Sequence, residues 1–423
     1  MLTTYHYVST QYQNLKNYLL KIHGVRFERR SNREVVKRPS IPLFSSVFGP
    51  LEIKFPYLVL DEATAVKNVS SLAFQAIQEL RRNADTCVMM TGSPLDNNWN
   101  DTYAYMQLIR GHPFDSKAKV LKVFTGFDFD HPRPSAKPEG HYLDRFRAWL
   151  SAFTIRRPES TVTLPPLEVK LIKFELTDDE LCKSNEFFSG FLEKRAHSSL
   201  HDDSATGKDT AGQLQRIILG EDSRGKDITG FRWEAFTKAV QHSYHPMLVE
   251  ILADARGMSF GSSKDMKKHD VQAWKEWKKN MAQERNWESS RITAMLRTYS
   301  TVRHRDPDCA VLMFDESVYF LDIVHIALTA KKTTTQVFRM DGGQKPFVRD
   351  RTLKEFEAAP SPKVILLSRG VGGIGLSITC ANVVFLCGPW WKAEWETQAI
   401  NRAYRIGQTR AVTVYRFLGQ CDV

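Results

Sequence analysis

Short apolar runs that end at a polar residue or a glycine recur along the chain. They occupy Tyr57–Leu60, Cys87–Met90, Val311–Phe314, Val364–Leu367 and Val383–Cys387. A short continuous apolar run that stops abruptly, as the fourth does, is typical of a buried strand in a parallel sheet. The third run leads into a segment with helical spacing of its apolar residues. This pattern of hydrophobic positions predicts an α/β fold.

Glycines crowd the segment that follows the fourth run. Gly370, Gly372, Gly373 and Gly375 remove side chains over a few positions, so that the backbone can approach a phosphate or a ribose closely. The whole stretch 364–417 has the order strand, glycine-rich turn, strand, helix, strand. We therefore expect a ligand site beside the glycine-rich turn.

The helix predicted behind the fifth run carries two arginines. Gln398, Arg402 and Arg405 are spaced i, i+4 and i+7, which places all three on one face of a helix that we expect to end at Gly407. A planar, always-charged guanidinium binds phosphate oxygens in pairs and stabilises charge that develops during phosphoryl transfer. For two arginines alone a solvated cationic face is the simpler interpretation, but the neighbouring glycine-rich turn favours a polyphosphate site.

Polar residues also follow the first two runs. Asp61 and Glu62 come after the first run, and Thr91, Gly92 and Ser93 come after the second. Ligands of open α/β sheets bind outside the carboxyl ends of the strands, which is where a metal-bound nucleotide would lie. An Asp-Glu pair after a strand is commonly only a helix N-cap, so the pair indicates a nucleotide site only together with the second segment.

Size and composition allow two or three domains, because the chain has 423 residues of which 42% are hydrophobic. Its first residues lack the pattern of a signal peptide, and no apolar run approaches the roughly 18 residues of a membrane span, so we expect no membrane partner. The six cysteines form no CxxC pair, which indicates neither a disulfide framework nor a zinc site and fits a reducing compartment. The net charge of +11 is compatible with a polyanionic partner.

Several segments show no clear period. We expect residues 21–40, which are polar and basic, to form an exposed excursion, and residues 111–140 to form a surface insertion. Residues 178–305 are mostly polar, with a predicted helix at 231–249. The stretch 201–212 has few apolar residues, and we expect it to be disordered. These segments carry little functional information.

Two features of this region resemble ligand sites, but we do not interpret them as ligand sites. The aromatic stripe with Trp274, Met281 and Trp287 predicts packing of a helix rather than a ligand site. The segment Gly220–Asp227 nearly fits the P-loop pattern GxxxxGK[ST], but Asp227 replaces the hydroxyl that binds Mg²⁺ and adds negative charge beside the phosphates. No other candidate for a P-loop occurs in the sequence.

Several motifs resemble those of one family of motor ATPases. QAINRAYRIGQ behind SRGVGGIGLS resembles the fifth and sixth motifs of superfamily-two helicases, and the GGxGLxxT and RIGQ patterns are similar to the Swi/Snf family of DNA-translocating ATPases. YLVLDEATAVKN resembles the second motif of that family, and TGSPLDNN resembles the third. The resemblance covers residues 1–20, 51–110, 150–176, 231–249 and 289–420.

The resemblance implies an α/β fold with two RecA-like parallel-sheet lobes and a helical insertion between them. The expected boundaries are 1–176 for a partial first lobe, 177–305 for a helical and partly disordered insertion, and 306–423 for the second lobe, the helicase C-terminal domain. Residues 3–5 resemble a segment that lies well inside the first lobe of the family. We therefore expect the earlier part of that lobe, with its P-loop, to be absent, and this chain alone to be inactive.

The resemblance also assigns roles to the residues that match the motifs. Asp61 would hold Mg²⁺ through the bound ATP, Glu62 would orient or activate the attacking water, and Arg402 and Arg405 would complete the catalytic set. The nucleotide-binding residues would be Gln398, Gly373 and Gly375. The residues that contact DNA or couple it to the nucleotide would be Thr91, Gly92, Ser93, Arg369 and Gly370.

The sequence departs from the family pattern at a few positions. Thr64 stands where the family has a histidine, which puts in doubt the hydrogen bond of that histidine toward the third motif or the nucleotide. Gly388 replaces an aspartate before PWW, Lys392-Ala393 replaces Asn-Pro, and Tyr404 replaces a histidine. None of these changes removes an arginine.

The implied function is ATP-driven translocation along duplex DNA in the nucleus, in chromatin remodelling or DNA repair. Nucleosomes or other DNA-bound proteins would be the target, and DNA binding would be salt-sensitive and largely independent of sequence. The alternative is a truncated or degenerate copy without ATPase activity that binds DNA or a partner, and the missing P-loop motivates it. An RNA helicase is a more distant alternative, which the RIGQ and TGSPLDNN segments disfavour.

Overall fold

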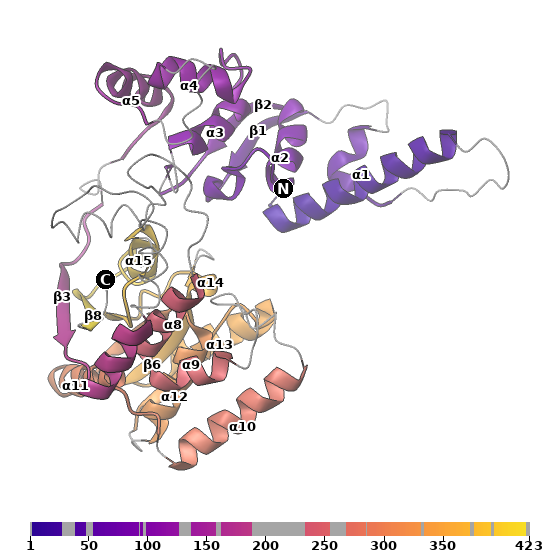
Figure 1. Cartoon of the computed structure of the whole chain (residues 1–423). Helices are drawn as coiled ribbons and strands as arrows, with labels where there is room; N and C mark the ends of the chain where they lie inside the picture. The colour runs from indigo at the N-terminus through magenta and orange to yellow at the C-terminus, as the bar shows by residue number, and fades with distance from the viewer. Residues whose placement is uncertain are drawn as a thin grey trace, which may run out of the picture. The chain divides into compact units, whose positions relative to one another are not determined.

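The computed structural model of the chain has two compact units, unit 1 (Met1–Arg156) and unit 2 (Arg157–Val423) (Figure 1). The stretch 201–212 and the P-loop-like segment Gly220–Asp227 lie outside the residues that the structure describes. The described residues are 2–27, 39–47, 54–92, 94–95, 99–126, 137–157, 162–187, 233–253, 268–284, 286–330, 334–372, 376–390 and 393–419.

Unit 1 contains a parallel strand pair with helices packed against one face. β1 (Phe55–Leu60) and β2 (Ala84–Met89) pair in parallel, and α2 (Leu72–Arg82) is the crossover between them. A parallel pair needs such a crossover because its two strands run in the same direction. The inward side chains of the pair share one hydrophobic core with α2 and with the long helix α1 (Tyr5–Phe27).

Local sequence explains why α2 forms where it does. Ser71 is the N-cap, and its hydroxyl accepts a hydrogen bond from the backbone N–H of Phe74 at 3.1 Å. Phe74, Ile77 and Leu80 are spaced three residues apart and are all buried, so the helix presents one apolar face to the core. The helix ends at the C-cap residue Asn83.

The prediction of an exposed excursion at 21–40 is wrong at its start. α1 continues to Phe27, whereas residues 28–38 lie outside the described part of the chain. Once a helix is anchored, each added residue gains one backbone hydrogen bond without a new nucleation cost, and lysine and arginine are good helix formers. A missing apolar period therefore does not exclude the extension of a helix that is already packed.

The prediction of a surface insertion at 111–140 is also wrong in part. α4 (Lys117–Thr125) forms inside it, and its side chains Val120 and Phe124 are 0% and 1% exposed. They pack with α5 (His141–Phe153) in an aromatic cluster of their own. The cluster also contains Trp99, Met106, Phe114 and Phe146. Apolar residues of α4 thus find partners that are not its neighbours in sequence.

Unit 2 is built on a six-stranded sheet in which every described pairing is parallel. The strand order is β3-β8-β7-β4-β6-β5. The predicted runs at 311–314, 364–367 and 383–387 are found as β4, β6 and β7. The bounds of the strands are β3 Leu167–Phe174, β4 Ala310–Asp315, β5 Gln336–Met340, β6 Lys363–Ser368, β7 Val383–Leu386 and β8 Val412–Gly419.

Helices cover both faces of this sheet. α11 (Ser290–Arg305) and α12 (Val318–Ala330) pack with one set of strand side chains. α13 (Pro346–Ala358) and α15 (Ala393–Ile400) pack with the other set through Phe356 and Ala399. Along β4, β6 and β7 successive residues alternate between the two cores, and all of them are buried. The prediction of an α/β fold with parallel sheets is confirmed.

β3 differs from the expected boundary at residue 176. It pairs in parallel with β8 over its whole length, from Leu167 opposite Val412 to Phe174 opposite Gly419. It therefore lies in the sheet of unit 2, whereas the expected first lobe, 1–176, included it. Apolar alternation defines a strand but does not say which sheet the strand joins, because that choice depends on pairing with a segment far along the chain.

The helices before α11 belong to the core of unit 2. They are α8 (Trp233–Tyr244), α9 (Pro246–Ala253) and α10 (Lys268–Glu284). The aromatic stripe is buried, since Trp274 and Met281 are 6% and 1% exposed, and both lie in the core cluster that covers one face of the sheet. The interpretation of the stripe as packing is confirmed.

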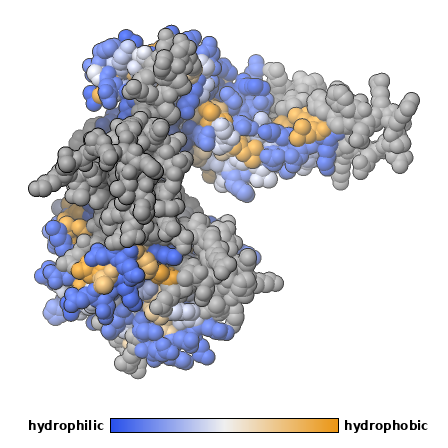
Figure 2. Space-filling model, viewed as in Figure 1, coloured by the Kyte–Doolittle hydropathy of each residue, from blue (hydrophilic) through white to orange (hydrophobic). Residues whose placement is uncertain are grey.

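The described surface that faces the viewer is mostly hydrophilic, with small hydrophobic patches between (Figure 2). Among the described helices none is long and apolar enough to cross a membrane. Buried apolar side chains form the hydrophobic cores of the two units.

Candidate functional site

The ends of β1 and β2 bring two of the predicted motifs together in unit 1. The Met90 N–H donates to the Leu60 carbonyl at 2.8 Å, and the Ala63 N–H donates to the Met90 carbonyl at 2.9 Å. These bonds hold the loop after β1 against the residue that ends the second run. Asp61 and Glu62 therefore lie at the same edge of the strand pair as the start of the second polar segment.

Glu62 has an unusual backbone conformation. Its φ and ψ are 49° and 56°, in the left-handed region, and within the described residues it is the one non-glycine residue with positive φ. This conformation costs roughly 1–2 kcal/mol for an L-residue. Both Glu62 and Asp61 are exposed, so the strained turn presents two carboxylates at the carboxyl ends of parallel strands.

Two hydrogen bonds position Asp61 at the end of β1. Its carboxylate accepts a hydrogen bond from the Glu62 N–H at 3.1 Å, and its carbonyl accepts one from the Tyr5 hydroxyl at 2.8 Å. Burial, and then the charge of Asp61, raises the pKa of Tyr5 to about 12. An exposed carboxylate at a strand end suits Mg²⁺, which is usually bound by one or two carboxylates together with substrate phosphates.

The arginine segment in unit 2 is only partly helical. α15 ends at Ile400, so the prediction of a helix as far as Gly407 is wrong, and Arg402 and Arg405 lie in the turns that follow. The two arginines nevertheless converge, because both guanidiniums donate to the carbonyl of Leu376, at 3.4 and 3.2 Å. Arg402 is 7% exposed.

The Leu376 carbonyl lies directly after the glycine-rich turn. Gly373 and Gly375 lie outside the described residues, but Leu376 is described, and Ile378 donates its N–H to the Arg402 carbonyl at 2.8 Å. Backbone and side-chain bonds thus join the chain after the turn to the arginine segment. The arginines therefore contact Leu376, the first described residue after the glycine-rich turn.

Gly407 and Gln408 explain the end of the arginine segment. Gly407 has φ of 100°, which a glycine adopts without strain. The buried Gln408 side chain donates to the carbonyls of Ala381 and Ala403, at 2.7 and 3.0 Å. Its side-chain oxygen accepts from the next two backbone N–H groups. The RIGQ segment therefore fixes the turn between the arginines and β8.

Arg369, which follows β6, contacts two residues that the motifs did not indicate. Its guanidinium lies 3.3 Å from the carboxylate of Glu316 and 3.8 Å from the ring centre of Trp395. Glu316 follows β4 directly, so the rule that pointed to Asp61, a carboxylate after an apolar run, could have found it. The tryptophan offered no such signal, because its contact depends on the packing of α15.

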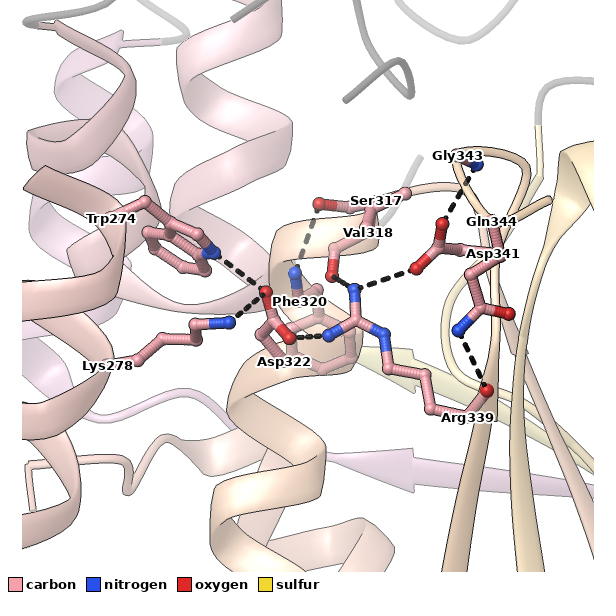
Figure 3. A network of polar contacts seen from close by, with 10 residues as sticks. All are labelled: Trp274, Lys278, Ser317, Val318, Phe320, Asp322, Arg339, Asp341, Gly343 and Gln344. Carbon is pink, nitrogen blue, oxygen red and sulfur yellow. Dashed lines mark hydrogen bonds and ion pairs between the residues drawn. The ribbon is translucent and has the colours of Figure 1, made fainter. Parts of the chain in front are cut away.

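A buried network positions the loop after β5 (Figure 3). Asp322 of α12 pairs with Arg339 of β5 and with Lys278, whose amine lies 3.5 Å from the carboxylate. The indole N–H of Trp274 donates to the same carboxylate at 2.7 Å. Asp322 therefore ties α10, α12 and β5 together, and a single buried carboxylate with three such partners is well satisfied.

Arg339 extends the network to the turn that follows it. Its guanidinium lies 3.5 Å from the Asp341 carboxylate, which also accepts the Gly343 N–H at 2.9 Å. A side chain at Gly370 would contact the Gly342 backbone at 4.0 Å. The turn after β5, which Figure 3 shows at Asp341 and Gly343, thus lies close to Gly370, just after the end of β6.

Gly388 departs from the family pattern for a visible reason. A Cβ at this position would lie 2.0 Å from the Tyr244 hydroxyl and 2.3 Å from the ring carbon that bears it. Tyr244 is fixed by Phe320, whose ring centre is 5.1 Å away, and by the guanidinium of Arg291 at 4.2 Å. The tyrosine ring therefore occupies the space that a side chain at position 388 would need.

The predicted site residues thus form two groups, one in each unit. Asp61, Glu62, Thr91 and Gly92 lie at one edge of the strand pair in unit 1, whereas Ser93 lies outside the described residues. In unit 2, Arg369 and Gly370 follow the carboxyl end of β6, Gln398 lies on α15, and Arg402 and Arg405 lie in the turns after α15, in contact with Leu376. Whether the two groups face one nucleotide stays a prediction.

Unit 2 has a parallel sheet and two converging arginines, and unit 1 has a carboxylate pair at the end of a parallel strand, so the chain is an α/β protein with candidate phosphate-binding groups in each unit. Residues 1–221 match the SNF2-related domain, and residues 291–407 match the helicase conserved C-terminal domain. The chain belongs to the SNF2-related family.

Relatives of known name are similar over most or part of the chain. The DNA repair protein RAD5A of Arabidopsis thaliana is 26% identical over 88% of this chain and 42% of its own length. The DNA repair protein RAD5 of Cryptococcus neoformans is 37% identical over 31% of this chain and 11% of its own length. The chain spans less than half the length of these curated relatives.

A solved structure is also similar. The Sulfolobus solfataricus SWI2/SNF2 ATPase core in complex with double-stranded DNA is 22% identical, with a TM-score of 0.37, over 87% of this chain and 64% of that chain.

Proposed function

We propose that this chain is part of an ATP-driven motor that moves along duplex DNA and remodels protein bound to it. The observation that carries the proposal is the convergence of Arg402 and Arg405 on the carbonyl after the glycine-rich turn. Two guanidiniums held toward one point suit a polyphosphate. Membership of the SNF2-related family and the DNA repair names of the relatives support this class of function.

Each unit would contribute different groups to ATP hydrolysis. The carboxylate of Asp61 would hold Mg²⁺, which neutralises phosphate charge when it is bound. Glu62 would orient the attacking water by accepting a hydrogen bond from it, or activate it by accepting its proton. Arg402 and Arg405 would stabilise charge on the phosphate that is transferred, with Gln398, Gly373 and Gly375 beside the nucleotide.

The residues after β2 and β6 would connect the nucleotide to DNA. Thr91, Gly92 and Ser93 follow one strand, and Arg369 and Gly370 follow the other. Such strand-end groups can contact the sugar-phosphate backbone, which carries no sequence information. We infer nuclear duplex DNA, with nucleosomes or other bound proteins as the target.

Binding to DNA is the first test. We expect the full chain to bind a labelled duplex in fluorescence anisotropy, with an affinity that falls steeply as salt rises, because phosphate contacts release counterions. We expect little difference between duplexes of unrelated sequence, since no base-reading element was found in the sequence. An affinity that ignores salt, or that selects one sequence strongly, would contradict the proposal.

Hydrolysis is the second test. Phosphate release from ATP is measured with and without duplex DNA, for residues 1–423 and for the same residues joined to a P-loop segment at their amino end. We expect Glu62→Gln to abolish turnover in whichever form shows it while DNA binding is retained, because the carboxylate acts on water and not on DNA. Turnover that survives Glu62→Gln would overturn the site assignment. DNA binding without turnover in both forms would favour a binding module.

A further inference from the structure

Arg369 is held between two groups at the carboxyl edge of the sheet of unit 2. β4 and β6 pair with Asp315 opposite Ser368, so the residues that follow, Glu316 and Arg369, emerge side by side. Their side chains form an ion pair of 3.3 Å, and the guanidinium stacks 3.8 Å from the ring centre of Trp395 on α15. Three elements thus meet at one arginine.

The two contacts use different parts of the guanidinium. The ring of Trp395 contacts the flat face of the group, which leaves the N–H donors at the edge available. Glu316 takes one of those donors. The Arg369 side chain is 43% exposed and that of Glu316 is 22% exposed. Stacking on Trp395 therefore orients the guanidinium, while another acceptor can replace Glu316 at its edge.

The carboxylate of Glu316 occupies a place that a phosphate could take. Exposed ion pairs are weak, whereas a phosphate carries more charge and more acceptor oxygens than a carboxylate. Burial raises the pKa of Glu316, and the charge of Arg369 opposes that shift, so the carboxylate is incompletely compensated where it stands. Open α/β sheets bind ligands at this edge.

We propose that Glu316 is an internal competitor that occupies Arg369 until a phosphate group displaces it. This inference rests on the proposed function, because it makes the exchange part of phosphate recognition by the motor. The phosphate belongs either to the DNA backbone or to the nucleotide. Since Trp395 belongs to α15, which leads to Arg402 and Arg405, the arginine remains stacked on the helix of the candidate catalytic arginines during the exchange.

Removal of the competitor is the direct test. In Glu316→Gln the amide keeps the shape of the side chain but loses its charge. We expect this variant to bind duplex DNA or ATP up to about fivefold more tightly, since a half-exposed ion pair is worth no more than roughly this factor. If the phosphate is that of DNA, the slope of log affinity against log salt steepens by about 0.9, as expected for one added phosphate contact.

A second ion pair of the same sheet supplies a matched control. Asp306 and Arg410 pair at 2.6 Å with side chains that are 30% and 41% exposed. They precede β4 and β8 and thus lie at the amino ends of the strands, whereas Glu316 and Arg369 follow the carboxyl ends of β4 and β6. Asp306→Asn changes the net charge by the same amount as Glu316→Gln. We expect it to leave the affinity and the salt slope close to those of the wild type.

Two further variants keep the test independent of folding defects. Arg369→Gln is expected to weaken phosphate binding, and the double variant Glu316→Gln/Arg369→Gln is expected to show none of the gain. Melting curves by circular dichroism establish that each variant is folded. A gain in the double variant as large as in Glu316→Gln alone would overturn the inference, because the effect would not pass through Arg369.

The remaining outcomes separate this inference from the proposed function. A gain with DNA alone, or with ATP alone, supports the exchange and identifies the source of the phosphate. Wild-type binding that Glu316→Gln changes no more than Asp306→Asn overturns the inference and leaves the proposed function standing. Absence of both DNA and ATP binding in every folded variant overturns the proposed function and the inference with it.

Discussion

Lowering the pH from 7.5 to 5 is expected to destabilise unit 2 through one buried histidine. His245 is 1% exposed, and its Nδ1 accepts a hydrogen bond from the Met247 N–H at 3.2 Å. It therefore caps α9, which starts at the next residue. A protonated ring could not accept this bond, and its charge would be buried.

The direction of the effect follows from the pKa of the group in each state. Burial lowers the pKa of His245 from 6.5 to about 4, although a hydrogen bond to the Trp287 backbone and the charge of Glu180 oppose the shift. Between these two values the unfolded chain binds more protons than the folded one. The stabilisation from a neutral His245 is therefore complete above pH 6.5 and is lost as the pH falls toward 4.

The proton-linkage relation sets the size of the loss. With pKa values of 6.5 and about 4, the free energy of unfolding falls by roughly 2 kcal/mol between pH 7.5 and pH 5, and by about 3 kcal/mol at pH 4. Burial also lowers the pKa of His242, so its contribution has the same sign. We therefore compare variants at His245 rather than the wild type alone.

Urea unfolding followed by tryptophan fluorescence measures this effect at pH 7.5 and pH 5. His245→Asn is the matched variant, because an asparagine can cap α9 with its side-chain oxygen but does not titrate. We expect the wild type to lose roughly 2 kcal/mol more than the variant on acidification. The contribution of unit 1 cancels in this difference. An equal loss in both proteins would refute the argument that His245 is held neutral by burial.

Two further predictions concern the packing around Tyr244. Gly388→Ala is expected to destabilise unit 2 by about 1–3 kcal/mol, because the new methyl group overlaps the tyrosine ring. Combining it with Tyr244→Ala is expected to cost less than the sum of the two single changes in urea midpoints, and strict additivity would contradict the clash. Arg291→Met is expected to lower the free energy of unfolding by roughly 3–5 kcal/mol. Arg291 is 0% exposed and donates to three backbone carbonyls, which would lose their partner. Arg297→Met on the same helix is the control. A cost of Arg291→Met no larger than that of its control would show that those bonds add little.

Local sequence was sufficient to predict the strands that pack almost entirely against apolar side chains. The bounds of β4, β6 and β7 lie within one residue of the predicted runs. A strand that is covered on both faces is apolar at nearly every position, so the first polar residue marks its end. The same rule located Asp61 and Glu62, since the carboxyl end of a strand is visible as the last apolar residue. The resemblance of the motifs then indicated the family, which the match to the SNF2-related domain shows.

Tertiary structure decided what depends on partners far along the chain. β3 joins the sheet of unit 2 only because β8 lies 245 residues further on and offers it a free edge, as Leu167 opposite Val412 shows. α4 is helical although its surroundings lack a period, because Phe124 finds an aromatic cluster. Arg402 and Arg405 converge without a continuous helix, because both bind the Leu376 carbonyl.

Glu316, Trp395 and Tyr244 show the same limit at the candidate site. Each acts on a residue more than 25 positions away in sequence, through an ion pair, a stacking contact or an occupied volume. Periodicity records only which side of an element faces apolar surroundings. Periodicity does not say which side chain a residue contacts, because the packing of the strands and helices decides that. The sequence by itself therefore determined the elements and the family, and the packing decided which charged groups meet.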